Sequence, residues 1–447
     1  MVGSGLQTYL ILGVFGAVIL LIALDVLDIA VTALLGVCIL LLTGSLTGED
    51  ILRAVGGGGD SLALLFGGMV VARVLTPTGI FDIAGYYFIR AVNGSGKRYL
   101  IGLMILIAPI CAFLPNATTV ILTAPIIIRM AQSLKVDFVT PVILCALVGN
   151  TAGILTLVGD PATFLVGSSI GLSFASYLTH ASLGGLLSLL AIIPVLPFIA
   201  RETWNTKRPP PEQLARPKLA NPVRFTLSLS VLVLMVVLFL IGPYLPDDVV
   251  PPSAAILCAS LALLLVNSTN AEPVEKVLGE LDWTTLVFLT CIFCLVEATS
   301  KTGVLAGLSR DLFATFGPNL HLAAIAILLV VFVISSVVAN IPLILAMTLV
   351  VKGYFVVSGL MPEAALGGAY GAWPVWTLPV FIAMTFGTTL GGGATMVGDS
   401  SNIVACGICA KAGERVTFLR FLSIGLPISV TQLVAAGIYV VVIGHIL

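Results

Sequence analysis

Long apolar runs of about 20 residues recur along nearly the whole chain, from Leu10 to Leu447, and they restrict the fold more than any other feature of the sequence. Of the 447 residues, 59% are hydrophobic and 9% are charged, whereas a soluble globular protein carries roughly 25% charged residues. Barrel strands would alternate apolar and polar residues, which these runs do not. The sequence therefore predicts an all-α polytopic membrane protein.

The apolar runs predict ten membrane spans, five in each half of the chain. They cover residues 7–24, 28–44, 61–77, 138–158, 178–200, 223–241, 252–267, 282–299, 375–398 and 419–446. The start, MVGSGLQTYL, lacks the basic region and cleavage motif of a signal peptide, so we expect the first span to be retained. Residues 1–200 form the first half and residues 223–447 the second, and between them residues 201–222 form a polar linker with five prolines.

The distribution of Lys and Arg predicts the orientation, because basic side chains near span ends stay in the cytoplasm. With the linker inside, 16 basic residues fall inside and four fall outside, namely Arg53, Lys301, Arg310 and Lys352. Both termini are then outside, and we expect an integral protein of the bacterial inner membrane.

This count requires that residues 99–134 and 319–351 do not cross the membrane. Each contains two arms of about 16 residues joined at a tip, FLPNATT or VVANIPL, which is short for two crossings near 20 residues each. We predict two re-entrant hairpins that open to opposite sides. Their tips must lie inside the protein, because polar backbone is not tolerated in lipid.

The two halves align as copies of one unit. Asp60-SLALLFGG matches Asp282-WTTLVFLT, the tip residue Asn116 matches Asn340, and GILTLVGDPATFLVG matches GGATMVGDSSNIVAC, at sequence offsets of 222, 224 and 239. The last offset grows through an insertion around GGAYGAWPVW. Five spans per half is an odd number, so the second copy is predicted to be inverted, an arrangement typical of secondary transporters.

One span in each half is interrupted by a stretch rich in glycine and hydroxyl residues, GNTAG through VGDPAT and GTTLGGG through VGDSSN. An opened helix at membrane depth exposes carbonyls that can coordinate a cation and half-helix N-termini that favour electron-rich oxygen. Together with the hairpin tips, these breaks predict one polar site between the repeats. Its candidate substrate-binding and ion-binding residues are Asn116, Thr118, Thr119, Asn150, Thr151, Asp160, Thr163, Asn340, Thr388, Thr389, Asp399, Ser400, Ser401 and Asn402.

Asp160 and Asp399 are the only acids in these breaks. A carboxylate at membrane depth is costly unless it is paired, solvated or protonated, so the pair points to proton binding or cation coordination. Each Asp can also simply cap the half-helix that follows it, and the two roles are compatible. For Asn116 and Asn340 the alternative is capping of the tip without contact to a solute.

Other motifs carry less weight. The pairs Cys291-x-x-Cys294 and Cys406-x-x-Cys409 have a spacing that suits a soft ion, but Cys in an apolar helix usually packs as a small hydrophobe, and we predict no metal site. The fragment GSGKR at 94–98 lacks the first glycine of a P-loop and follows no strand, so ATP-driven transport is not supported. No nucleophile, base and orienting group are grouped, no cofactor is implied, and a net charge of −1 offers nothing to nucleic acid.

The stretches LPNATTVILTAPIIIRMAQ, GNTAGILTLVGDPATFLVGSSIGLSFASYL and GTTLGGGATMVGDSSNIVACGICAKAG resemble the ion transporter superfamily over about residues 30–446. This group includes arsenite efflux pumps, the P protein, NhaD-type sodium/proton antiporters and divalent-anion:sodium symporters. The resemblance implies a scaffold domain and a transport domain that moves in elevator fashion. Relatives are often homodimers, so it also implies a homodimer; a soluble arsenite ATPase partner, known for the pumps, leaves no mark in this sequence.

The differences within the superfamily favour the arsenite-pump branch. Divalent-anion symporters are expected to carry Ser-Asn-Thr at both tips, whereas this chain has Pro-Asn-Ala-Thr at 115–118 and Ala-Asn-Ile-Pro at 339–342. Asp160 and Asp399 stand where those symporters typically have Ser or Thr, and at the first of these positions arsenite-pump and antiporter relatives often have Asp as well. The first break departs from the usual Pro-Pro-Asn with Pro-Ala-Thr at 161–163, while the second keeps Asn402.

We therefore expect a secondary transporter that exports a small inorganic solute, a metalloid acid or oxyanion such as arsenite or antimonite, in exchange for protons. The main alternative is a sodium/proton antiporter in which the same Asp pair alternates between Na⁺ and H⁺. A dicarboxylate symporter and an anion channel are further alternatives.

Overall fold

The computed structural model describes residues 5–23, 27–113, 115–208, 221–245, 249–269, 272–366 and 373–447. Within these ranges the chain is helical, and its only β-type pairing is an isolated bridge between Ser95 and Lys207. Most of the predicted linker, the tip residue Leu114 and most of the GGAYGAWPVW insertion lie outside the described residues.

Eleven of the described α-helices lie in the first half of the chain, and a twelfth, α12, lies at the start of the predicted linker. They are α1 (Gly5–Ala23), α2 (Ile29–Leu42), α3 (Gly48–Leu75), α4 (Ile80–Val92), α5 (Gly96–Cys111), α6 (Asn116–Leu134), α7 (Val139–Ala152), α8 (Pro161–Ser169), α9 (Phe174–His180), α10 (Ser182–Leu190), α11 (Leu196–Ile199) and α12 (Arg201–Asn205).

The second half contains the other ten. They are α13 (Pro222–Ile241), α14 (Pro251–Thr269), α15 (Val274–Gly279), α16 (Trp283–Ser300), α17 (Val304–Phe316), α18 (Leu320–Ser335), α19 (Asn340–Val357), α20 (Leu378–Gly392), α21 (Ser400–Lys411) and α22 (Phe418–Ile446).

Eight helices of the described ranges are long and apolar enough to cross a membrane, or nine if the bent pair α8–α9 counts as one. The expectation of an all-helical, polytopic membrane protein is therefore confirmed. The eight include α6 and α19, each the second arm of a predicted hairpin. The predicted span 178–200 was wrong as one helix: it is divided into α10 and α11 by turns at 191–195, because Pro194 and Pro197 have no N–H to continue the helical hydrogen bonds.

The same elements recur in the same order in both halves. Helices α4 and α17 have equal lengths, as do α5 and α18, and the shift from Ile80 to Val304 equals the shift from Gly96 to Leu320. The residue before α4 and α17 is a glycine with positive φ, Gly79 at 86° and Gly303 at 76°, where a side chain would be strained. The recurrence agrees in position with the sequence alignment of the two halves.

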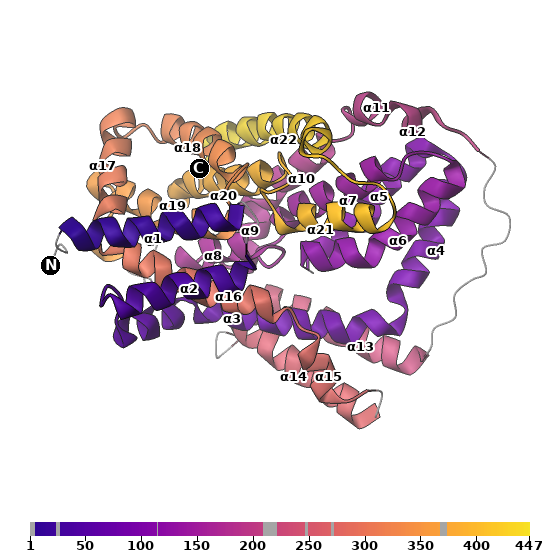
Figure 1. Ribbon diagram of the computed structural model, residues 1–447, viewed down its shortest axis with the longest axis horizontal. Coiled ribbons are helices and arrows are strands. Elements are labelled where there is room, and N and C mark those ends of the chain that lie inside the picture. The colour runs from indigo at the N-terminus through magenta and orange to yellow at the C-terminus, as the bar shows by residue number, and fades with distance from the viewer. Residues whose placement is uncertain are drawn as a thin grey trace.

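The helices form two packed groups, which Figure 1 shows below and above the middle of the molecule. In the scaffold bundle, α3 packs against α14 and α16, α16 against α2, and α13 against α14. In the hairpin bundle, α5 packs against α7, α18 against α20, and α20 against α22. The α5–α6 and α18–α19 hairpins enter this second bundle from opposite ends of the long axis (Figure 1).

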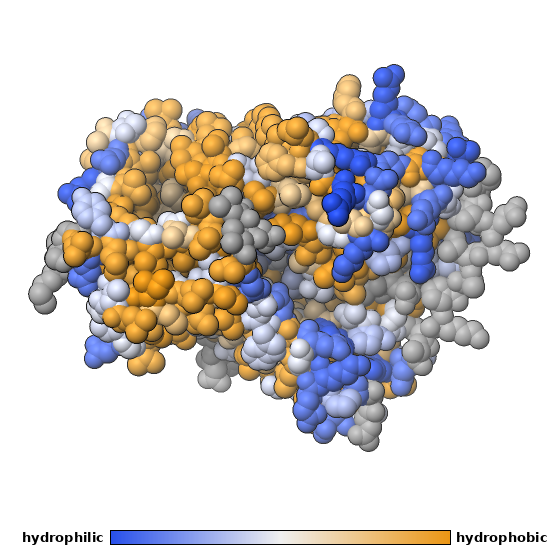
Figure 2. All heavy atoms as spheres, viewed as in Figure 1, coloured by the Kyte–Doolittle hydropathy of each residue, from blue (hydrophilic) through white to orange (hydrophobic). Residues whose placement is uncertain are grey.

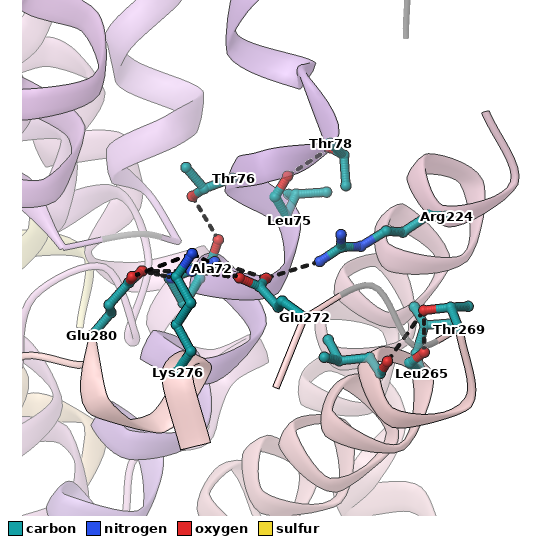
Figure 3. Close-up of polar contacts among 12 residues, drawn as sticks. Ala72, Leu75, Thr76, Thr78, Arg224, Leu265, Thr269, Glu272, Lys276 and Glu280 are labelled. Atoms are coloured by element: carbon teal, nitrogen blue, oxygen red, sulfur yellow. Dashed lines mark hydrogen bonds and ion pairs between the residues drawn. The ribbon is translucent and has the colours of Figure 1, made fainter. Parts of the chain in front are cut away.

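Ion pairs connect the two halves at both ends of α3. At its C-terminal end, Arg73 contacts Glu272 at 3.0 Å and Glu280 at 2.5 Å. Arg224 of α13 contacts the same Glu272 at 3.1 Å (Figure 3). At its N-terminal end, Asp50 lies 2.5 Å from Lys301. Burial raises the pKa of Glu272, but the hydrogen bonds from Arg73 and Arg224 outweigh burial and leave this pKa below its ordinary value. These pairs fasten α3 to the second half of the chain.

Apolar side chains cover much of the visible surface, as lipid contact requires. Figure 2 shows them gathered over α1, α2, α18 and α22, whereas polar side chains gather toward the end of the molecule that holds α12 and α15. The predicted outside charge Lys352 is not on the surface: its side chain is 2% exposed.

Candidate functional site

The hairpin tips place the two asparagines at the first position of a helix. Asn116 begins α6 after Pro115, and Asn340 begins α19 after Ala339, with nearly identical backbone angles at the two preceding residues (φ −55°, ψ 136° and φ −54°, ψ 142°). Both asparagines are buried, at 9% and 7% exposure. The two tips therefore present equivalent amide groups from different halves of the chain.

The breaks after α7 and α20 are fixed to the neighbouring hairpin by equivalent contacts. Thr156 donates its hydroxyl to the carbonyl of Ala112 at 2.5 Å, and Thr395 donates to the carbonyl of Ser336. Gly398 lies so close to the chain that a Cβ added there would be 2.6 Å from the carbonyl oxygen of Gly392. A larger residue cannot occupy this position without moving the backbone, so the sequence needs glycine at the crossing.

The aspartates are the N-caps of the half-helices that follow the breaks. Asp160 accepts a hydrogen bond from the backbone N–H of Ala162 at 3.1 Å and begins α8. Asp399 accepts from the N–H of Ser401 at 2.8 Å and from its hydroxyl at 2.5 Å, and begins α21. The capping role considered from the sequence is thus present for both residues. The cap uses one carboxylate oxygen of each aspartate: the second oxygen of Asp160 has no hydrogen bond from the described residues, and the second oxygen of Asp399 accepts one from the amide of Asn340.

One cavity of about 330 Å³ lies between the scaffold bundle and the hairpin bundle. It is lined by both tips, both capping aspartates, and residues of α3, α13 and α16. Five of the fourteen predicted site residues line it: Asn116, Asp160, Asn340, Asp399 and Ser400. The structure therefore brings together the two aspartates and the two tip asparagines, which are far apart in the sequence.

The other nine predicted residues do not line this cavity. They are Thr118, Thr119, Asn150, Thr151, Thr163, Thr388, Thr389, Ser401 and Asn402. Several of them stabilise the breaks: Asn402 donates to the carbonyls of Gly392 and Thr395, both at 2.9 Å, and Asn150 donates to the carbonyl of Thr389 at 2.6 Å. In this conformation such residues support the cavity wall and do not face it.

The two tips differ in their hydrogen bonds. Asn340 donates its amide N–H to Asp399 at 3.0 Å, and the hydroxyl of Ser335 lies 2.8 Å from its amide oxygen. The amide oxygen of Asn116 is buried without a hydrogen-bond partner among the described residues. An unpaired buried acceptor is costly, so the amide oxygen of Asn116 is free to accept a hydrogen bond from a ligand. The amide of Asn340 already forms its hydrogen bonds within the protein.

Three cavity residues were missed by the sequence reasoning. Asp282, Thr284 and Thr285 line the cavity from the start of α16, where Asp282 caps the helix by accepting from the N–H of Thr285 at 3.0 Å. The alignment with Asp60 marked Asp282 as a repeat position, which was a usable signal. Gly79 and Gly303 are equivalent residues, and α3 and α16 lie before them without a break. Asp60 and Thr284 precede these two glycines by the same number of residues, so the structure makes Thr284 the equivalent of Asp60.

The charge of the cavity is of one sign. Its described lining includes three aspartates and no Lys, Arg or His. No group of three or more His, Cys, Asp or Glu side chains that could hold a metal ion occurs within the described ranges. Such a cavity suits a cation, a proton or an uncharged hydroxyl compound, because a free anion would meet carboxylates without a compensating positive charge.

Apolar helices long enough to cross a membrane and a carboxylate-lined cavity between two bundles are typical of a polytopic helical membrane transporter. A family model described as a citrate transporter matches residues 19–367. The chain belongs to this citrate transporter family, within the ion transporter superfamily.

Individual relatives agree with this assignment. An uncharacterized transporter of Synechocystis sp. is 41% identical over 96% of both chains, and one of Mycobacterium tuberculosis is 30% identical over 95% of this chain and 96% of its own. The human P protein is 24% identical over 86% of this chain and 53% of its own length. Two of these three relatives are named as transporters, and none of the three is named as an enzyme.

The fold is also found in a solved structure. The YdaH transporter of Alcanivorax borkumensis matches 90% of this chain and 86% of its own with a TM-score of 0.57. The two sequences are 12% identical in this alignment, so the likeness concerns the fold alone.

Proposed function

We propose that the protein is a secondary transporter that exports an uncharged metalloid acid, arsenite or antimonite, in exchange for protons. The observation that carries this proposal is the pair of capping aspartates, Asp160 and Asp399, facing one cavity together with Asn116 and Asn340. The carboxylates bind the coupling protons. The asparagine amides and Ser400 donate and accept hydrogen bonds with the hydroxyl groups of the solute.

The solute class follows from charge. Arsenite and antimonite are uncharged trihydroxides at neutral pH. They can therefore enter a cavity whose described lining includes three carboxylates and no basic side chain. They also offer several hydroxyl donors to Asp160 and Asp399. A protonated and an ionised carboxylate differ as hydrogen-bond partners, and this difference couples solute binding to the proton.

The proposed movement uses the two bundles as units. The halves are two inverted repeats, each with one re-entrant hairpin, and the hairpin bundle moves past the scaffold bundle in elevator fashion. The constant shift between equivalent helices of the two halves and the ion pairs of α3 support this division, since those pairs make the scaffold bundle a single body. Both termini lie outside a bacterial inner membrane, and two copies associate through the scaffold bundle.

Citrate is the second candidate, because the family model carries that name and covers residues 19–367. Citrate is a trianion near neutral pH, and the described cavity lining provides no positive side chain for it. It would have to enter neutralised by protons or by a bound cation. A third candidate, sodium/proton exchange, uses the same two aspartates with Na⁺ in place of the solute.

Flux into proteoliposomes with an imposed pH gradient separates these candidates. We expect antimonite or arsenite to be exchanged against the gradient, and Asp160→Asn and Asp399→Asn to abolish this exchange. Asp60→Asn serves as the matched control, since Asp60 is an exposed acid of α3 outside the cavity. Sodium-dependent collapse of the pH gradient in the absence of solute would overturn the metalloid proposal in favour of sodium/proton exchange. Flux of citrate, with or without a divalent cation, and no flux of metalloid would overturn it in favour of citrate transport.

A further inference from the structure

Among the residues that the structure describes, one lysine is buried, and it lies inside the hairpin bundle. The side chain of Lys352, on α19, is 2% exposed, and its ammonium group lies 5.7 Å from the centre of the Trp373 ring. No Asp or Glu forms an ion pair with it within the described ranges. A charged group in such surroundings is expensive, which argues that the position needs it.

The ammonium group points to the end of another helix. The Nζ atom of Lys352 donates a hydrogen bond to the carbonyl oxygen of Ser169, the last residue of α8, at 2.6 Å. The chain bends by 106° between α8 and α9 directly after this residue. Lys352 therefore lies at the C-terminal end of the half-helix whose N-terminal end is capped by Asp160.

Other carbonyls in the last turn of α8 have partners from their own segment. Gly167 accepts from the N–H groups of Ile170 and Leu172, and Ser168 accepts from the N–H of Gly171. For the carbonyl of Ser169, Lys352 is the donor that the described residues provide. The lysine thus satisfies a helix-terminal acceptor that the sharp bend leaves without a backbone donor.

The equivalent half-helix in the second half of the chain, α21, has a lysine of its own at its C-terminal end. Helix α21 begins at the cap Asp399 and ends at its own lysine, Lys411, which is exposed. The last turn of α8 contains no basic residue. Both half-helices therefore have an aspartate at the positive end and a lysine at the negative end of their dipole, but α8 receives its lysine from α19.

We propose that Lys352 is a positioning residue, supplied by the second hairpin, that holds α8 against α19 and thereby sets the spacing between Asp160 and Asn340. Asn340 is the first residue of α19, Lys352 lies on the same helix, and α19 packs along α8. A contact between Lys352 and the far end of α8 thus fixes α8 relative to the tip. This inference rests on the proposed function, because it concerns the spacing of residues proposed to bind the solute and the protons.

Hydrogen exchange of the purified full-length protein in lipid nanodiscs tests the contact without any transport. In Lys352→Met we expect the amides of α8 to exchange about tenfold faster, because the helix loses its terminal donor and cation, while the amides of α21 serve as an internal control and stay unchanged. Lys352→Gln, which keeps a donor but not the charge, should fall between Met and wild type. Lys352→Arg should retain most of the protection.

Relocating the cation separates a positioning role from simple packing. In the double variant Lys352→Met with Ser169→Lys, the last residue of α8 carries its own lysine, as Lys411 does in α21, and protection of α8 should return to within about threefold of wild type. Unchanged exchange of α8 in Lys352→Met, or equal acceleration in α8 and α21, would overturn the proposal. If Lys352→Met does not fold, Lys352→Gln with and without Ser169→Lys gives the same comparison.

The second readout is the exchange kinetics of the solute that the wild type carries. We expect Lys352→Met to raise the KM about tenfold with the maximal rate within about twofold, since the spacing of the binding groups changes and the amount of folded carrier does not. A lower maximal rate with an unchanged KM would contradict the positioning role. Absence of metalloid flux in the wild type would instead refute the proposed function, and the hydrogen-exchange result would stand separately.

Discussion

The hydrogen bond between Asn340 and Asp399 gives the sharpest prediction, because the other half of the chain provides its control. The amide N–H of Asn340 lies 3.0 Å from the carboxylate of Asp399, whereas no hydrogen bond joins the equivalent pair, Asn116 and Asp160, within the described ranges. A double-mutant cycle of Asn340→Ala with Asp399→Asn should therefore show coupling. The same cycle of Asn116→Ala with Asp160→Asn should show little.

The magnitude follows from the geometry. A hydrogen bond to a charged group contributes about 1.5–3 kcal/mol net in proteins, while measured cycles for hydrogen bonds within membrane proteins average about 0.6 and reach about 1.7 kcal/mol. Since Asp399 is partly buried and also bonded to Ser401, we expect a coupling free energy of about 1.5 kcal/mol for Asn340–Asp399. For Asn116–Asp160 we expect less than about 0.5 kcal/mol.

The assay is unfolding by sodium dodecyl sulfate in mixed micelles, followed by tryptophan fluorescence at pH 8, with the free energy of unfolding extracted for the wild type, the single variants and the double variants. Equal coupling in the two cycles would refute the inference that the tips are used differently. Coupling near zero for Asn340 and Asp399 would show that this bond does not contribute to stability.

Three further outcomes are expected. Glu272→Gln should lower the free energy of unfolding by about 2 kcal/mol by weakening the partly buried contacts with Arg73 and Arg224, as the same detergent titration would measure. Because the folded pKa of Glu272 is depressed, its wild-type contribution should be fully present above its ordinary pKa of 4.5 and be lost as the pH falls through the folded pKa, a trend that Glu272→Gln should flatten. Gly398→Ala should reduce the yield of folded protein on size-exclusion chromatography, since the new Cβ would lie 2.6 Å from a carbonyl oxygen, whereas Gly407→Ala, with no atom within 4 Å, should match wild type. Asp282→Asn should raise the KM for the coupling ion severalfold in proteoliposomes by removing one of three cavity carboxylates, and an unchanged KM would contradict a contribution of Asp282 to ion binding in the cavity.

The difference between predicted and observed elements has a local cause. Helix α3 begins at Gly48, whereas the predicted span begins only at position 61, because the charged residues Glu49, Asp50, Arg53 and Asp60 lower the local hydropathy without breaking the helix. The predicted span 178–200 failed in the opposite direction, since its hydropathy is continuous while Pro194 and Pro197 interrupt the hydrogen bonds. Hydropathy reports burial in lipid and does not report helix continuity.

The candidate site shows where sequence reasoning stops. Asp160 and Asp399 were recognisable because an acid within an apolar, glycine-rich break is rare, and Asn116 and Asn340 because they recur at the same repeat position. The sequence did not indicate which of the polar residues face the cavity. Asn150 and Asn402 look equally suited in the sequence, yet their amides are used to bind carbonyls at the breaks.

The sequence by itself determined the class of this protein: its apolar runs require helices in lipid, and its internal similarity pairs the breaks and the tips, because hydrophobicity and repetition are properties of single segments. The tertiary structure decided which side chains share a space. It placed Asp282 at the cavity and Lys352 at the end of α8, and it gave Asn340 a partner that Asn116 lacks among the described residues. These contacts join segments far apart in the chain, and their geometry depends on how helices pack, which no local pattern of residues encodes.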